Sequence, residues 1–246
     1  MGQLTELTKD SNAQIPVLLQ AGGQGTRLRP YTDQVPKPML QVGGVPILER
    51  LLRHFVALGF REFVIVVGRM GEIIDSHFRR IDVGDVDLTF IWEEAPKGNV
   101  GALQNLEGRN TPVVLAFGDL LTDLDASALV EEHVQKENDL TLASHLHRDH
   151  MEFGELVTDG RRVLEYREKP ERQYLICSGI LVASPRAVRQ IRMLGPKANL
   201  VDLVMSCISA GFKVGSWHHN ASWLDINSQE MLHRANDFLA SIIHGA

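Results

Sequence analysis

The fold is decided by residues 15–28, which read Ile15-Pro16-Val17-Leu18-Leu19-Gln20-Ala21-Gly22-Gly23-Gln24-Gly25-Thr26-Arg27-Leu28. The first part is a short apolar run, which is typical of a strand buried inside a sheet. The second part is a glycine cluster whose backbone amides can approach and wrap an anion. Arg27 adds a guanidinium that can form charge-assisted hydrogen bonds with phosphate oxygens. The stretch therefore predicts a buried strand that ends at an anion-binding loop.

Beyond this stretch, segments typical of strands and helices alternate along the first half of the chain. Patterns of apolar residues predict strands at 63–67, 88–92, 112–117 and 140–144, and helices at 47–58, 72–78, 101–107 and 126–136. This alternation predicts an α/β fold with a Rossmann-like, mixed but mostly parallel sheet flanked by helices. In such sheets ligands bind at the carboxyl ends of the strands. The glycine cluster and Gly118-Asp119 both fall on that edge.

The second half of the chain is less regular and richer in predicted strands. We expect short strands at 155–158, 162–167, 180–183 and 213–218, and helices at 186–193, 200–210 and 229–243. Asp159-Gly160 is typical of a hairpin turn. A smaller β-rich part is therefore expected to follow the main sheet.

Composition narrows the possible classes of protein. The 246 residues carry a formal net charge of -6, which disfavours a nucleic-acid binder that relies on a broad basic face. No apolar run is long enough to span a bilayer, and the polar first residues lack the pattern of a signal peptide. Cys177 and Cys207 lie outside any metal-binding pattern, which favours reduced thiols. We therefore expect a cytoplasmic protein that binds neither nucleic acid nor a membrane.

A second motif, Val35-Pro36-Lys37-Pro38, follows the glycine cluster and places a lysine on a stiff segment. The glycine cluster is not a Walker loop, because the Gly-Lys-Ser/Thr ending is missing. It is not a dinucleotide fingerprint either, because the glycine spacing is wrong. A nicotinamide-dependent oxidoreductase is therefore disfavoured.

With these motifs the chain resembles the sugar-1-phosphate nucleotidylyltransferases, also called NTP-transferases, whose hallmark is GGxGTRL followed by PKP. Three further motifs of that family follow in the same order as Gly118-Asp119, Glu168-Lys169-Pro170 and Trp223-Leu224-Asp225-Ile226. The resemblance covers nearly the whole chain in a short single-domain form, without a trailing hexapeptide repeat. It is closest to the guanylyl branch, which includes mannose- and heptose-1-phosphate enzymes.

The resemblance implies a reaction and a role for each motif. A nucleoside triphosphate and a sugar or sugar-like 1-phosphate would be joined, with release of pyrophosphate. Asp119 and Asp225 resemble the family's Mg²⁺-holding pair, and Mg²⁺ prefers carboxylates together with phosphate oxygens. Arg27 and Lys37 would steady the triphosphate, and Lys169 would hold the sugar phosphate. These roles fit phosphoryl transfer, which needs positioning and charge neutralisation more than covalent help.

The same resemblance assigns binding residues and divides the chain. The expected nucleotide-binding residues are Ala21, Gly22, Gly23, Gly25, Thr26, Glu93 and Gly98, and the expected sugar-binding residues are Gly154, Glu168, Ser178 and Gly179. A flexible leader is expected over residues 1–14, followed by a single domain over 15–246. Within that domain, the nucleotide-binding half is about 15–145 and the sugar-phosphate-binding half about 146–246. A homodimer is possible.

The identity of the base depends on Glu93, where many thymidylyl and uridylyl members place a glutamine. A carboxylate only accepts hydrogen bonds, which suits guanine, because its N1–H and N2–H₂ groups both donate along one edge. We therefore favour GTP. UTP or dTTP is the alternative, and a non-catalytic regulator that only binds a sugar nucleotide is the alternative from a different class.

Four residues depart from the family pattern, namely Gln20, Lys97, Asn99 and Asn227. Gln20 replaces an apolar residue and is expected to alter a contact near the base, while Asn227 follows a proposed metal ligand closely. The histidines at 145, 147, 218 and 219 lack metal-site spacing and are interpreted as structural or surface groups.

Overall fold

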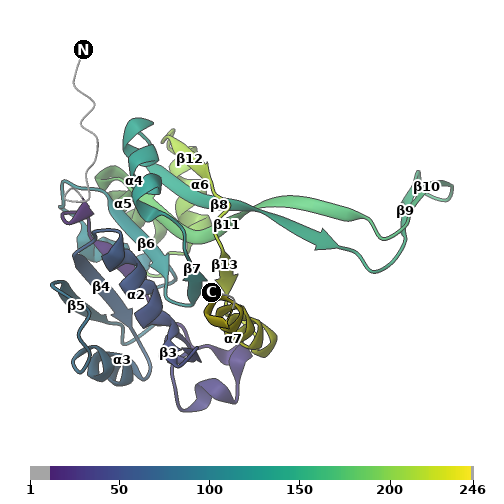
Figure 1. Cartoon of the computed structure of the whole chain (residues 1–246). Coiled ribbons are helices and arrows are strands. Elements are labelled where there is room, and N and C mark those ends of the chain that lie inside the picture. The colour runs from purple at the N-terminus through teal and green to yellow at the C-terminus, as the bar shows by residue number, and fades with distance from the viewer. Residues whose placement is uncertain (1–11, 245–246) are drawn as a thin grey trace.

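A seven-stranded sheet runs through the body of the protein in the order β12-β8-β11-β6-β1-β4-β5 (Figure 1). The computed structural model describes residues 12–244. The sheet strands are β1 Val17–Gln20, β4 Glu62–Val67, β5 Asp87–Trp92, β6 Val113–Phe117, β8 Leu140–His150, β11 Glu171–Ala183 and β12 Val214–His218. The structure also contains three two-stranded pairs: β2 Gln41–Val42 with β3 Val45–Pro46, β7 Leu120–Thr122 with β13 Trp223–Asp225, and β9 Glu155–Thr158 with β10 Val163–Arg167.

Helices flank this sheet. The α-helices are α2 Ile47–Ala57, α3 Gly71–Phe78, α4 Ala126–Gln135, α5 Pro185–Gln190, α6 Leu200–Ser209 and α7 Gln229–His244. Short 3-10 helices are η1 Thr26–Leu28, η2 Tyr31–Asp33, η3 Lys37–Met39, η4 Gly101–Leu106 and η5 Ile191–Leu194. Over the described residues, no helix combines the length and the apolar character needed to cross a membrane.

The strand directions confirm the predicted α/β class. β1 pairs in parallel with β4 and β6, and β4 pairs in parallel with β5. β11 runs antiparallel to both β6 and β8, and this makes the sheet mixed. Val17, Leu18 and Leu19 are fully buried, as expected for a central strand covered on both faces.

Local sequence signals fix where the helices begin and end. Asp125 caps α4, because its side chain accepts hydrogen bonds from the amides of Ser127 and Ala128. The chain leaves α2 at Gly59, which has φ +94° and follows the last helical turn. The apolar side of α2 then packs against the sheet, with Phe55 and Leu52 fully buried.

A long arm leaves the body where β8 and β11 run on together past the rest of the sheet (Figure 1). The expected strands at 140–144 and 180–183 were too short, because the ladder extends to the pair His150–Glu171. Residues 145–150 and 171–177 mix polar and apolar side chains on both faces, so they lack the one-sided pattern of a half-buried strand. The predicted Asp159-Gly160 hairpin is confirmed, since β9 and β10 pair across it.

The expected leader over 1–14 falls outside the described residues as far as position 11. Near the end of this expected leader, Asn12 is buried and packed against the body of the protein. Its Nδ2 atom donates to the carbonyl oxygen of Leu58 at 2.9 Å and to Ser127 Oγ at 2.7 Å. Asn12 therefore ties the start of the described chain to α2 and α4.

Burial of His133 predicts a pH-dependent stability. Its Nδ1 lies 2.9 Å from Thr141 Oγ1, and burial lowers the pKa of His133 to about 4. The unfolded chain, with a normal histidine pKa near 6.5, binds the proton first as the pH falls. The free energy of unfolding should therefore decrease between pH 6.5 and 4, by up to about 3 kcal/mol from this residue.

The test is urea unfolding at several pH values in the wild type and in His133→Asn. The variant should show a shallower dependence of the unfolding free energy on pH over that interval. Equal slopes in the two proteins would contradict the assignment. His218→Asn serves as the control for removing a histidine that is exposed.

Candidate active site

Two carboxylates meet at the carboxyl edge of the sheet because β7 and β13 pair. Asp119 directly precedes β7, and Asp225 ends β13 opposite Leu120. The amide of Ile226 also donates to the carbonyl oxygen of Asp119 at 3.1 Å. Antiparallel pairing thus brings together two acidic residues that are far apart in the sequence.

Lys37 lies between these two carboxylates. Its Nζ is 2.5 Å from Asp119 Oδ2 and 3.6 Å from Asp225 Oδ1. The side chain of Lys37 is only 12% exposed. Lys37 is the first residue of a short helix, η3, which follows Pro36 and contains the buried Pro38. The ammonium is therefore held in place by a stiff segment rather than by a flexible loop.

The two carboxylates fit a divalent metal such as Mg²⁺. Asp225 Oδ1 is buried and has no hydrogen-bond partner among the described residues, while Asp225 Oδ2 accepts from Asn227 Nδ2 at 3.0 Å. Two carboxylates face one ammonium, so a net negative charge remains. Hard oxygen ligands of this kind suit Mg²⁺, which completes its shell with water and phosphate oxygens. No group of three His, Cys, Asp or Glu side chains with metal-site geometry occurs in residues 12–244.

The glycine loop packs directly on the lysine segment. Gly25 has φ +61°, and a Cβ there would lie 3.0 Å from both Lys37 Cβ and Thr32 Cγ2. Thr32 Oγ1 donates to the carbonyl oxygen of Gly25 at 2.8 Å. Beside this contact is a cavity of about 260 Å³, lined by Gly23, Gln24, Gly25, Thr26, Arg27, Leu28, Lys37, Asp119 and Asn227. Exposed amides, a guanidinium and an ammonium make this cavity suitable for an anion.

A second cavity adjoins the first and shares Gly23 and Asp119 with it. It measures about 310 Å³ and is lined by Gln20, Gly22, Gly23, Glu93, Pro96, Gly98, Asn99, Phe117 and Asp119. Gln20 and Glu93 both approach Gly22, where a Cβ would be 3.6 Å from Gln20 Nε2 and 3.7 Å from Glu93 Oε2. The two cavities together form one continuous site.

Unpaired acceptor atoms are concentrated in this site. Among the described residues, four buried side-chain atoms lack a hydrogen-bond partner, and three of them are Gln20 Oε1, Glu93 Oε1 and Asp225 Oδ1. Burial raises the pKa of Glu93, and a hydrogen bond from the amide of Lys97 opposes this shift only in part. Because a buried acceptor without a donor is costly, these atoms indicate where a ligand would supply donors or a cation.

The loop that carries Glu93 is held by the segment before α6. Gly98 has φ +85°, and a Cβ there would lie 2.1 Å from the carbonyl oxygen of Ala198. The amide of Ala198 donates to the carbonyl oxygen of Lys97 at 2.8 Å, and Asn99 Oδ1 accepts from the amide of Leu200 at 2.7 Å. Asn99, one of the departures from the family pattern, therefore fastens this loop to α6.

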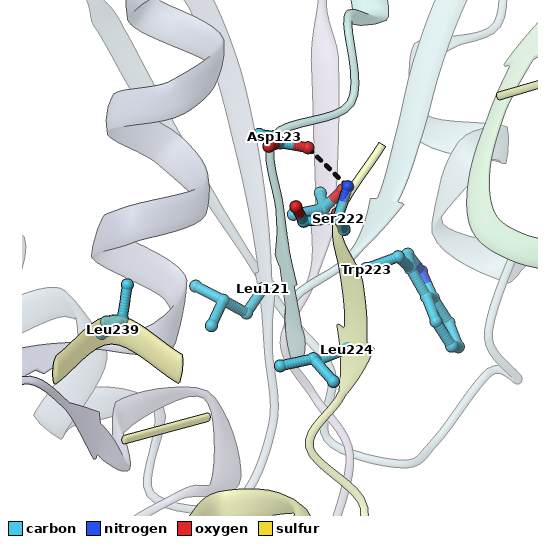
Figure 2. Close-up of a pocket in the computed structure, with 7 residues that line it drawn as sticks. Leu121, Asp123, Ser222, Trp223, Leu224 and Leu239 are labelled. Carbon is cyan, nitrogen blue, oxygen red and sulfur yellow. Dashed lines mark hydrogen bonds between the residues drawn. The ribbon is translucent and has the colours of Figure 1, made fainter. Parts of the chain in front are cut away.

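Two of the expected sugar-binding residues lie at the base of the arm, beside the site. The carbonyl oxygen of Ser178 accepts from Trp223 Nε1 at 2.7 Å. Gly179 has φ +73°, and a Cβ there would lie 2.9 Å from Phe117 Cδ2. Trp223 points to the opposite side of the β13 strand from Leu121 and Leu239 (Figure 2). It therefore packs and donates a hydrogen bond at the arm base.

The other expected residues of the sugar half lie out on the arm. Gly154 packs against Tyr166, whose hydroxyl donates to Glu168 Oε2 at 2.9 Å. Lys169 follows in a turn with φ +45°. It lies ten positions before Gly179, and at roughly 3.3 Å per residue the two are about 30 Å apart. The structure therefore gathers Arg27, Lys37, Asp119 and Asp225, but holds Lys169 away from them within one copy.

A side-chain network at the arm base was not found by sequence reasoning. Ser178 Oγ lies 2.8 Å from His145 Nδ1 and 2.7 Å from His219 Nε2. Burial lowers the pKa of His145 and lowers that of His219 to about 4, so both rings are neutral near pH 7. The alternation of His145 and His147 along a strand was the available signal, but the partners come from distant segments.

The chain is similar to known proteins over most of its length. The profile of the nucleotidyl transferase family matches residues 15–242. Mannose-1-phosphate guanylyltransferase of Mycobacterium tuberculosis is 32% identical over 161 residues, which are 64% of this chain and 45% of that protein. UTP–glucose-1-phosphate uridylyltransferase of Synechocystis is 28% identical over 231 residues, which are 85% of this chain and 59% of that protein. The chain thus spans about half the length of these curated relatives.

A similar solved structure is that of HddC from Yersinia pseudotuberculosis complexed with GMP-PN. The TM-score is 0.71 at 23% identity, and the match covers 92% of this chain and 100% of that chain. At this level of identity the similarity shows a shared fold, and it agrees with the predicted sheet and flanking helices.

The paired carboxylates predict metal binding that can be measured without a substrate. Calorimetric titration with Mn²⁺ measures this binding directly. Asp119→Asn and Asp225→Asn should each weaken Mn²⁺ binding about tenfold or more, since each substitution removes a charged ligand. Lys37→Met should strengthen binding, because the ammonium no longer competes for the same oxygens. Asp85→Asn, an exposed aspartate outside the site, is the control. Unchanged affinity in all three site variants would contradict this assignment.

Proposed function

The chain belongs to the nucleotidyl transferase family, and we propose that it joins GTP to a sugar or sugar-like 1-phosphate, giving a nucleoside diphosphate sugar and pyrophosphate. One observation carries the proposal. Two adjoining cavities share Gly23 and Asp119, and one offers two cations and a carboxylate while the other offers buried acceptor atoms. A nucleoside triphosphate has matching parts, namely phosphates that need cations and a base that supplies donors.

The choice of GTP depends on Gln20 and Glu93. Both carry a buried acceptor oxygen without a partner among the described residues. An ionised carboxylate accepts and never donates, and guanine presents two adjacent donors, N1–H and N2–H₂. If one base donated to both acceptors, two buried polar atoms that are costly when unpaired would gain hydrogen-bond partners. The guanylyltransferase among the similar proteins supports the same choice.

UTP is the second candidate, because a uridylyltransferase is also among the similar proteins. Uracil has one N–H donor flanked by two carbonyl oxygens. Glu93 could accept from that donor, but only the amide of Gln20 could donate to a neighbouring carbonyl. UTP would therefore use one fewer of the unpaired acceptors, which is why GTP is preferred.

The proposed reaction is an in-line displacement at the α-phosphorus. An oxygen of the sugar phosphate forms a bond to that phosphorus, and the bond to the oxygen bridging the α- and β-phosphates breaks. Pyrophosphate leaves with the bonding electron pair. No general base is needed, because the attacking phosphate is already an anion at neutral pH.

Each charged residue then has a positioning task. Arg27 would steady the leaving β- and γ-phosphates, Lys37 the α-phosphate, and Lys169 the sugar phosphate. Asp119 and Asp225 would hold Mg²⁺, which neutralises phosphate charge when bound. Ser178, Gly179, Gly154 and Glu168 are the proposed sugar-binding residues.

The reaction is tested by pyrophosphate release. The protein with Mg²⁺ is incubated with ATP, CTP, GTP, UTP or dTTP and with a panel of sugar 1-phosphates. Release with GTP and a hexose or heptose 1-phosphate is the expected result. Release only with UTP or dTTP would keep the reaction and reject the base. No release with any pair would contradict the proposed activity.

Substitution of Glu93 should change the base preference. Glu93→Gln replaces one acceptor by a donor, so kcat/KM with GTP should fall about 10- to 100-fold, equivalent to one charged hydrogen bond of about 1.5–3 kcal/mol. The ratio of UTP to GTP efficiency should rise at the same time. Glu94→Gln is a matched control, because Glu94 is the exposed neighbour. Equal losses for both nucleotides would show that Glu93 does not read the base.

The raised pKa of Glu93 predicts a pH effect on nucleotide choice. Protonation would convert one acceptor oxygen into a donor. Because burial raises this pKa, the change should occur at a higher pH than for an exposed glutamate. The GTP-to-UTP efficiency ratio should therefore decrease as the pH falls through the raised pKa of Glu93, and it should stay flat in Glu93→Gln. Using the ratio cancels the titration of the triphosphates themselves.

A further inference from the structure

The arm, defined as residues 145–176, has no neighbouring element along most of its length (Figure 1). β12 pairs with β8 only as far as Ser144, and β6 pairs with β11 only over Ile180–Ala183. Both edges of the ribbon are therefore unpaired within the described part of the chain. A two-stranded ribbon is marginal on its own, and unpaired strand edges invite pairing with another chain.

Large apolar side chains cover the arm. Those that are 45% to 77% exposed are Leu146, Phe153, Leu156, Val163, Leu164, Tyr166, Tyr174 and Leu175. Leu146 lies directly opposite Leu175, and Leu156 opposite Tyr166, so four of these eight side chains form two cross-strand pairs. Grouped exposure of this kind marks a surface that another protein covers.

The base of the arm fixes its direction. Folding back onto its own site would require a sharp bend at the irregularity between Cys177 and Leu181. Ser178 lies there, and its Oγ bonds to His145 and His219 while its carbonyl oxygen accepts from Trp223. A sharp bend would break these contacts, so the arm points away from the body.

The tip of the arm carries what the site lacks. Gly154, Tyr166 and Glu168 are already assembled there, and Lys169 makes no hydrogen bond or ion pair in the part of the chain described. At the site, two carboxylates face one lysine, and Asp225 Oδ1 has no hydrogen-bond donor. The arm therefore has an unused cation and the site an excess of negative charge.

We propose that the arm of one copy completes the active site of a second copy, where it delivers Lys169 and Glu168 to the sugar phosphate. The assignment of Lys169 to that phosphate rests on the proposed function. In a two-fold dimer both arms would be exchanged, so that two equivalent sites form. The dimer would also cover the apolar side chains of the arms.

In the second copy, a pocket lined by the residues just before Asp225 in the sequence would receive those side chains. A cavity of about 360 Å³ is lined by Leu121, Thr122, Asp123, Ser222, Trp223, Leu224 and Leu239. Its three leucines come from β7, β13 and α7 and lie on one side of the pocket (Figure 2). The amide of Ser222 donates to Asp123 Oδ1 at the end of the β7–β13 pair. In the proposed dimer an apolar side chain of the arm would occupy this pocket, on the face of the β7–β13 pair opposite to the Trp223 side chain.

Subunit complementation tests the exchange. Asp225→Asn removes a metal ligand from the body, and Lys169→Ala removes the cation from the arm, so each protein alone should be inactive. In mixed dimers one site combines an intact body with an intact arm. Random mixing should restore about a quarter of wild-type pyrophosphate release, because half of the dimers carry one intact site. Lys136→Ala, an exposed lysine on the body, is the control and should retain activity.

Each other outcome is informative. No restoration from two inactive variants would overturn the proposal and show that the arm serves its own copy. Full activity of Lys169→Ala alone would also overturn it. Inactivity of the wild type itself would contradict the proposed function instead, and the next measurement then decides about the arm.

That measurement does not need activity. Two differently tagged proteins are prepared, both with Cys177→Ser. One carries Lys169→Cys and the other carries Asn227→Cys. The mixture is treated with a short bismaleimide. A cross-linked product containing both tags is expected, since Lys169 of one copy would lie near Asn227 of the other. Its absence, or sedimentation of the wild type as a monomer at the same concentration, would overturn the proposal.

Discussion

The site is organised around one ion-paired group, in which Lys37 lies between Asp119 and Asp225. Three distant segments must be in place for this contact. The two proline neighbours stiffen the lysine segment, the end of β6 presents Asp119, and the pairing of β7 with β13 brings in Asp225. Removing the ammonium would leave two carboxylates side by side with only a metal to offset their repulsion. The glycine loop packs on the same lysine, so the anion-binding surface depends on it as well.

In the proposed function, unpaired buried acceptors give the site its selectivity for a base. Folding tolerates few such atoms, since each costs roughly 1–3 kcal/mol. Of the four in the described residues, two lie at the proposed base position and one at the proposed metal position. Stability is therefore lowered at the places where a ligand would restore the missing interactions, and a ligand without two adjacent donors would restore less.

The sequence was sufficient for the body of the fold and for the residues that the structure brings together at the candidate site, because these depend on short-range patterns. The apolar run before the glycine cluster predicted β1, and the Pro-Lys-Pro segment marked the lysine that the structure places between Asp119 and Asp225. Gln20 departs from the family pattern, and the structure places it near Glu93. These signals were readable because each combines a local conformation with a chemical group.

Features that depend on contacts between residues far apart in the sequence could not be predicted from the sequence. The length of β8 and β11 was missed, because arm residues have no core face and therefore no one-sided apolar pattern. The bonds from Ser178 to His145 and His219 join three segments, and nothing in the sequence around Ser178 specifies them. Asn12 likewise shows its role only through Leu58 and Ser127.

In the proposed function, two buried acceptors, Gln20 Oε1 and Glu93 Oε1, bind a base with two adjacent donors. Equilibrium binding of GTP, ITP and UTP in the presence of Mg²⁺ tests it most directly, because inosine lacks only the N2 amino group of guanine. GTP is expected to bind about tenfold more tightly than ITP, which corresponds to one hydrogen bond, and UTP is expected to bind more weakly than GTP. Equal affinity for GTP and ITP, or tighter binding of UTP, would contradict it.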